Sequence, residues 1–222
     1  MNKLISIFLF ILSSQLVFAQ QSDFDTYRVL GGSIRFYNTV SDGPNANVMD
    51  VKRLEFSASP YFGKQIKSNL MIGLRLNGSF SKANSTQLYS TPSGVFPIDN
   101  ENRNFGFSMD VFTRTYLNPD NKLKFYLEPH FLVGRYSSGY SSGQSANLEF
   151  MNHYTSTSVS LGVRSGLIYP LNEKFNLIIR AGSLYYRSTK RTDMVTDYSD
   201  KSKEFVFFYG LSAISYGVEF KF

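Results

Sequence analysis

Hydrophobic and polar residues alternate along most of the chain, and this period of two predicts β-strands with two chemically different faces. The pattern predicts eight strands, over residues 27–38, 52–63, 70–82, 103–117, 123–137, 155–169, 175–187 and 204–222. Short connections rich in Asn, Pro and Asp, such as 118–122, alternate with long polar ones, such as 83–102, 138–154 and 188–203. Alternately short and long connections are typical of an antiparallel up-and-down meander. The sequence therefore predicts a single all-β domain.

One face of the predicted strands is bulky and apolar, and the other carries small residues and charges. The residues expected to form a polar network on the second face are Arg35, Arg53, Glu55, Arg75, Asp110, Arg114, Glu128, His130, Arg164, Arg180 and Glu219. An eight-stranded barrel is just wide enough inside for side chains, and one arginine facing lipid at the membrane midplane costs ~2–4 kcal/mol. We therefore expect an eight-stranded transmembrane barrel with its apolar face toward lipid and its charges paired inside. The alternative is a secreted, lipocalin-like barrel.

Two features depart from the simple alternation. Charged residues that share the apolar face should lie near strand ends, and those that do are Arg28, Lys52, Lys82, Arg135, Arg187 and Glu204. Pro60 and Pro129 fall inside predicted strands on that face. Because proline cannot donate to a β-ladder, we expect a β-bulge at each.

The beginning of the chain has the composition of a targeting segment. Residues 1–19 combine Lys3, a short apolar run and small residues at 17 and 19. This arrangement predicts a secretory signal peptide over 1–19 and a barrel domain over 20–222. The apolar run is too short for a transmembrane helix.

The C-terminal segment resembles the signal that the outer-membrane barrel assembly machinery recognises. Its matching residues are Ser215, Gly217, Phe220 and Phe222. With the strand pattern and the stretch 60–63, it makes the chain similar to small outer-membrane β-barrels of the OmpA/OmpX type, in particular to those of Bacteroidota. The resemblance implies a bacterial outer-membrane location, periplasmic termini, four extracellular loops and the assembly machinery as a partner. Unlike OmpA itself, the chain shows no periplasmic domain after the last strand, and without Trp its aromatic belts must consist of Tyr and Phe.

Composition limits the chemistry that the chain can support. Among its 222 residues there is no Cys, so thiolate metal sites, cysteine nucleophiles and lipoprotein anchors are excluded. A mean hydropathy of −0.19 excludes a polytopic helical membrane protein. There is no phosphate loop and no metal-ligand spacing, so we expect no cofactor and no metal. His153, with Thr155 two residues later, is similar to part of a lipid A deacylase site, but the surrounding sequence does not match, and we expect no enzyme activity.

The expected function is that of a non-enzymatic, monomeric barrel with a closed, ion-paired interior that anchors surface loops. Basic residues near the loop end could contact lipopolysaccharide phosphates; they are Lys82, Arg103, Arg135, Arg187, Lys190 and Arg191. The net charge of +6 is too dispersed, and the compartment wrong, for a nucleic-acid partner. Two alternatives stay open. One is a narrow channel that prefers anions, lined by the inward arginines, and the other is a lipid A-modifying enzyme.

Overall fold

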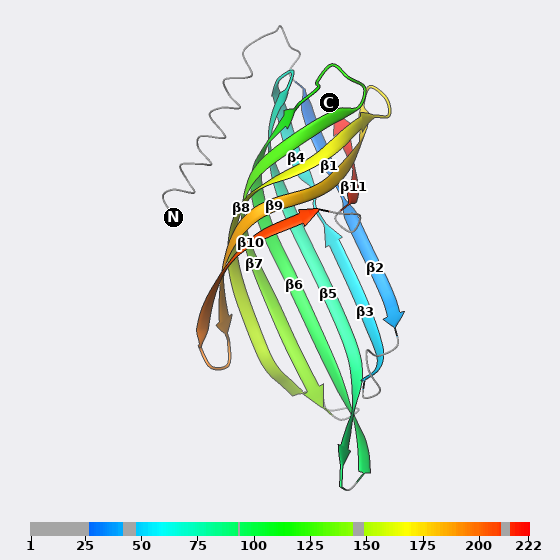
Figure 1. Cartoon of the computed structure of the whole chain (residues 1–222), viewed down its shortest axis with the longest axis vertical. Coiled ribbons are helices and arrows are strands. Elements are labelled where there is room, and N and C mark those ends of the chain that lie inside the picture. The colour runs from blue at the N-terminus through cyan, green and yellow to red at the C-terminus, as the bar shows by residue number, and fades with distance from the viewer. Residues whose placement is uncertain (1–26, 42–47, 93, 144–148, 210–213) are drawn as a thin grey trace.

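The computed structural model describes residues 27–41, 48–92, 94–143, 149–209 and 214–222. The predicted signal peptide lies outside the described residues. Figure 1 shows an elongated molecule built from long, tilted strands. The strands are β1 (Arg28–Gly32), β2 (Ile34–Ser41), β3 (Val48–Ala58), β4 (Tyr61–Lys67), β5 (Leu70–Thr91), β6 (Gly94–Tyr116), β7 (Lys124–Gly143), β8 (Glu149–Pro170), β9 (Phe175–Asp193), β10 (Ser199–Tyr209) and β11 (Ser215–Lys221).

Eight of these strands close into a ring of antiparallel ladders, in the order β1, β4, β5, β6, β7, β8, β9, β11 and back to β1. The ring is sealed where the first and last strands meet. The backbone N–H of Arg28 donates to the carbonyl of Phe222 at 2.9 Å, and that of Phe222 donates back at 3.0 Å. The remaining strands continue the ring, since β2 follows β1, β3 precedes β4 and β10 precedes β11. The predicted eight-stranded antiparallel barrel is therefore confirmed.

Short turns join the strands at one end of the barrel, as the sequence predicted. In the turn after β6, the Asn118 side chain accepts from the N–H of Phe125 at 2.6 Å and donates to the carbonyl of Leu123 at 2.7 Å. After β8, the Asn172 oxygen accepts from the N–H groups of Lys174 and Phe175. Asparagine side chains thus replace the backbone partners that a tight turn leaves unpaired. We call this the short-turn end.

The opposite end, which we call the hairpin end, differs from the sequence-based expectation. The segments 83–102, 138–154 and 188–203 were expected to be loops, but most of their described residues are strand. β5 and β6 remain paired up to Thr91 and Gly94, and Figure 1 shows their hairpin projecting beyond the other strands. Thr and Tyr favour strands, and their polar groups can face water on either side of a ladder. The polar composition therefore indicated where the strands leave the apolar band, and not where they end.

The expected bulges at Pro60 and Pro129 are absent. Pairing with β5 keeps one register from Ala58 with Gly78 to Tyr61 with Arg75, and pairing with β8 is continuous through Pro129. At Pro60 the ladders on both sides are briefly interrupted and resume in the same register, and at Pro129 only the ladder with β6 is interrupted. A bulge lies instead in β9, where Gly166 pairs with Arg180 and Ser165 pairs with Gly182, so that Ala181 is the extra residue.

The two faces of the ring have opposite polarity. Bulky residues point outward and are exposed, for example Ile72 at 44% and Leu30 at 54%, while the charged side chains described below point inward. Outward aromatic rings cluster near the short-turn end, where Phe175 and Phe220 lie 5.2 Å apart between ring centroids. A soluble protein rarely exposes an apolar surface of this extent, and an inverted barrel of this kind spans a membrane. The fold is an eight-stranded transmembrane β-barrel.

In the described part of the chain, no helix is long and apolar enough to cross a membrane.

Candidate functional site

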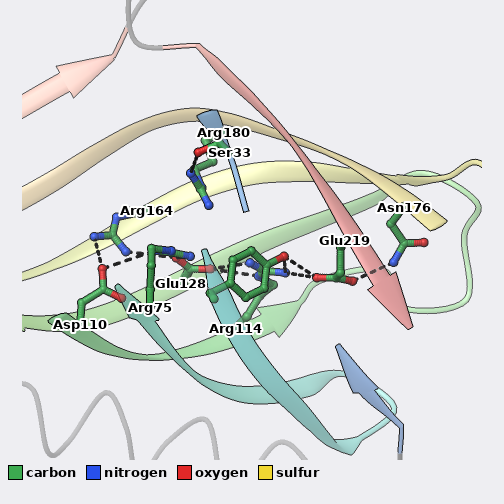
Figure 2. Close-up of polar contacts among 10 residues, drawn as sticks. Ser33, Arg75, Asp110, Arg114, Glu128, Arg164, Asn176, Arg180 and Glu219 are labelled. Carbon is green, nitrogen blue, oxygen red and sulfur yellow. Dashed lines mark hydrogen bonds and ion pairs between the residues drawn. The ribbon is translucent and has the colours of Figure 1, made fainter. Parts of the chain in front are cut away.

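The inside of the barrel holds a network of buried ion pairs (Figure 2). At its centre, the guanidinium of Arg114 on β6 donates to Glu128 on β7, with distances of 3.0 and 2.8 Å from Nε and Nη2 to Oε2. Its Nη1 donates to Oε2 of Glu219 on β11 at 2.9 Å. All three side chains have an exposed fraction of 0%. One arginine therefore joins strands that are far apart in the sequence across the interior.

Two further arginines extend this network toward the hairpin end. Arg75 on β5 donates to Glu128 at 2.7 Å and to Asp110 at 3.4 Å. Arg164 on β8 donates to Asp110 at 2.6 Å and to Glu128 at 3.2 Å. Glu128 thus accepts from three guanidinium groups: Arg114 donates twice to Oε2, and Arg75 and Arg164 donate to Oε1. Such charge-assisted bonds are stronger than those between neutral groups.

Aromatic side chains complete the site, and two of them, Tyr61 and Phe112, were not assigned to the interior by the sequence analysis. The Tyr61 hydroxyl donates to Glu219 at 2.6 Å, and the Asn176 amide donates to the other oxygen of that carboxylate at 2.8 Å. The guanidinium carbon of Arg75 lies 4.6 Å from the Phe112 ring centroid, and that of Arg114 lies 4.6 Å from the Tyr126 centroid. The arginines therefore lie between carboxylates and ring faces, where cation–π attraction adds to ion pairing.

Interior glycines make room for these rings. On one of the two neighbouring strands, the cross-strand partner is a glycine for each of Tyr61, Phe112, Tyr126, Tyr136 and Tyr185. A Cβ added at Gly31 would come within 2.5 Å of the Tyr61 ring. Glycine had been expected to leave space for arginine; the space is taken directly by aromatic rings. A glycine opposite an aromatic residue in the predicted register is the signal that would have located them.

Not every residue of the expected polar network joins it. Arg180 donates to Ser33 at 3.2 Å and has no ion pair among the described residues. His130 is buried beside the network, and its Nδ1 has no hydrogen-bond partner in the described structure. Arg53 and Glu55 pair with each other nearer the hairpin end, partly in solvent, and Arg35 is exposed on β2.

The charged side chains of the network are buried across the interior of the barrel. Arg75, Asp110, Arg114, Glu128 and Glu219 are each at most 2% exposed. Three arginines pair with three carboxylates here, and Arg180 lies beside them without an ion pair, so this part of the interior has one positive charge in excess among its described residues. Among the described residues, no group of three or more His, Asp or Glu is placed to hold a metal ion.

A second charged cluster lies on the outer face, beyond the pair that Phe80 of β5 forms with Phe105 of β6. Here Glu101 contacts Lys82 at 2.7 Å and also pairs with Arg103. Burial acts to raise the pKa of the Glu101 carboxyl, but the hydrogen bonds and charges of its two cationic partners outweigh this effect, and its pKa lies below the ordinary value. The cluster carries one net positive charge.

Of the other basic residues expected near lipopolysaccharide, two also face outward and two do not. By register, Arg135 lies on the outer face of β7, and Lys190 lies on the outer face of β9, where it pairs with β8. The bulge at Ala181 reverses the faces of β9 beyond it, because the side-chain period in a strand is two. Arg187 therefore lines an interior cavity with His130, and Arg191 stacks over the Tyr154 ring at 3.6 Å. The expectation that Arg187 and its partner Glu204 share the lipid-facing side is wrong for this reason.

His153 is placed at the outer face of the hairpin end. Its Nε2 lies 2.8 Å from the Ser137 hydroxyl oxygen, whereas Thr155 contacts Met194 instead. No carboxylate contacts His153 among the described residues. The serine partner comes from the neighbouring strand, so the spacing within one strand could not reveal it.

The C-terminal segment forms β11, whose residues pair with β1 and β9. Ser215, Gly217 and Phe220 lie on this closing strand, and Phe222 follows it.

No family model matches the chain, and no curated protein matches it. Solved structures with a similar fold include a major outer membrane protein from Thermus thermophilus, at 13% identity and a TM-score of 0.44, covering 90% of this chain and 100% of that one. Neisserial surface protein A has 18% identity and a TM-score of 0.32, with 90% and 100% covered. The outer membrane protease OmpT from Escherichia coli has 10% identity and a TM-score of 0.40, with 92% and 100% covered. These values carry no assignment of activity or of functional residues.

Proposed function

We propose that this chain is a monomeric, non-enzymatic barrel of the bacterial outer membrane, closed inside by its ion-pair network, which presents hairpins and a basic outer rim to the cell surface. The proposal rests on the inverted polarity of the ring, whose apolar side chains face outward. Its interior is crossed by charged side chains that are at most 2% exposed. The short-turn end would face the periplasm and the hairpin end the outside, as in outer-membrane barrels generally. The residues Ser215, Gly217, Phe220 and Phe222 would serve as the assembly signal.

The closed interior is tested by single-channel recording of the refolded barrel in a planar bilayer, with a heat-modifiable band on an unboiled gel as the control for folding. We expect folded protein to give no conductance steps. Replacing Arg75 and Arg114 together by Ala should open a path and produce steps. Steady anion-selective steps from the unmodified protein would establish the channel alternative and refute the closed barrel.

The surface role rests on outward cations just beyond the apolar band, where lipopolysaccharide phosphates lie. Lys82 and Arg103 share a single carboxylate, and Arg135 lies on the same face of the next strand. We expect the combined K82Q/R103Q variant to bind fluorescent lipopolysaccharide several-fold more weakly in a micelle titration. K174Q, which removes one exposed charge at the short-turn end, is the control. An equal loss in K174Q would show that only overall charge matters.

A lipid A-modifying activity is the second candidate, and the contact between Ser137 and His153 favours it specifically. A hydroxyl hydrogen-bonded to an imidazole at the outer-leaflet level is part of the arrangement of an acyl hydrolase. Mass spectrometry of lipid A from cells with and without the protein tests it. A mass change that is lost in S137A would establish the activity, and unchanged spectra would remove it.

A further inference from the structure

Beyond the closed ring, toward the hairpin end, the pairing of the strands in the barrel wall changes. β1 pairs with β4 and β11, but its continuation β2 pairs with β3 alone, and β10 pairs with β9 alone in the described part of the chain. Figure 1 shows β2 and β10 diverging toward the hairpin end. We call the interval between these two strands, which begins at Ser33, the seam. Along the seam these two strands do not pair with each other in the described part of the chain.

An apolar groove lies on the lipid-facing surface at the foot of the seam. Its volume is about 580 Å³, within the range of small-molecule sites. Ile34, Leu177, Tyr216 and Val218 form its sides, and the small residues Gly32 and Ala58, with Pro60, leave it hollow. The groove therefore suits a hydrocarbon chain lying along the barrel wall.

An unpaired arginine lies directly behind this groove. Ser33 lines the groove, and its hydroxyl accepts from Nη1 of Arg180 at 3.2 Å. The Nε of Arg180 is buried and has no hydrogen-bond partner among the described residues. No described carboxylate pairs with this guanidinium, whereas the neighbouring arginines pair with three carboxylates (Figure 2). Arg35, on β2, lies two residues beyond Ser33 on the same face of the barrel wall, roughly 7 Å along the strand. It is exposed and has no ion pair among the described residues.

We propose that the seam binds a long-chain carboxylic acid, with its carboxylate at Arg180 and Ser33 and its hydrocarbon tail in the groove. A carboxylate presents two acceptor oxygens to the planar guanidinium fork, and its single negative charge would balance the charge of Arg180, which has no ion pair among the described residues. Arg35 would guide the headgroup at the entrance. The site combines an apolar channel with few, well-placed polar groups, as small-molecule sites generally do.

The test uses the full barrel in micelles and a C16 carboxylic acid that carries a photoreactive diazirine near the end of its tail. Its methyl ester is the neutral comparison. We expect the acid to label peptides that contain Ala58, Leu177 or Val218 and to reach half-saturation at a concentration at least tenfold below that of the ester. R180Q should raise the half-saturating concentration of the acid at least tenfold and leave that of the ester unchanged.

Two matched variants make the outcome decisive, each checked for folding by heat modifiability. R53Q removes an arginine that is already paired with Glu55 and should bind the acid normally. A58F fills the groove without touching the interior and should reduce labelling, whereas V133F, on the opposite wall, should not. Equal labelling by acid and ester, unchanged affinity in R180Q, or labelling spread evenly around the barrel would each overturn the proposal. If R180Q does not fold, the comparison of acid with ester and the A58F result decide.

Discussion

Replacing Glu128 by Gln should destabilise the barrel more than any other single isosteric change inside it. This carboxylate accepts from Arg75 at 2.7 Å, from Arg114 at 2.8 and 3.0 Å, and from Arg164 at 3.2 Å. Glutamine keeps the volume but offers one acceptor oxygen, and its amide group points donors at guanidinium groups that can only donate. The substitution therefore leaves buried positive charge without a counter-charge.

The size of the effect follows from the burial of these groups. Arg114 and Glu128 are fully buried and Arg75 is 2% exposed, so water cannot replace the lost partner. Removing one member of a buried ion pair costs about 3–5 kcal/mol. With a urea slope of about 3 kcal/mol/M, the midpoint of unfolding should fall by roughly 1–1.7 M.

The assay is the folded fraction on unboiled gels after equilibration in urea with lipid vesicles, since a chain without Trp lacks the usual fluorescence probe. E55Q provides the matched control. Glu55 is 30% exposed and pairs with an exposed arginine, so its loss should cost less than about 1 kcal/mol. A midpoint for E128Q equal to that of E55Q would refute the reasoning, because it would show that the network contributes no net stability.

Three further results are expected. G73A should destabilise the barrel by about 1–3 kcal/mol in the same assay, because a Cβ there would lie 2.7 Å from the carbonyl oxygen of Phe62 and would press on an aromatic ring. The Glu101 carboxyl should titrate below the ordinary carboxyl range in a carbon-13 NMR pH titration, and K82Q should raise its midpoint. Because the folded pKa of Glu101 is lowered, its contribution to stability should be complete above the unfolded pKa and should be lost as the pH falls through the folded value. Amide hydrogen exchange should be slow along most of the β5–β6 hairpin; fast exchange throughout it would contradict a paired hairpin.

Regular alternation was sufficient to predict the ring and the face of most interior residues. From β5 to β8 each ladder keeps its phase through the membrane-spanning part, so the parity of Arg75, Asp110, Arg114, Glu128 and Arg164 could be read directly from the sequence. Their pairing could also be expected, because a closed interior brings inward charges together.

What the sequence did not predict arises from features that alternation does not encode. A bulge depends on one extra residue, and nothing in the sequence around Ala181 marks it as that residue. The two prolines suggested bulges, but a ladder can lose one hydrogen bond without changing its register. The rings of Tyr61 and Phe112 were not assigned because their glycine partners come from other strands, and cross-strand pairs require the register.

The buried network also explains how such a barrel selects one register. Replacing the ion pairs by well-packed apolar residues could match or exceed their stability, but both faces of the strands would then be apolar. A shift of one residue exchanges the faces of a strand, and with an apolar interior this exchange would carry little penalty. With arginines on β5, β6 and β8 and carboxylates on β6, β7 and β11, the same shift would expose charge to lipid and leave buried partners unpaired. We infer that the network is retained for register as much as for stability, since each pair fixes the relative position of two strands.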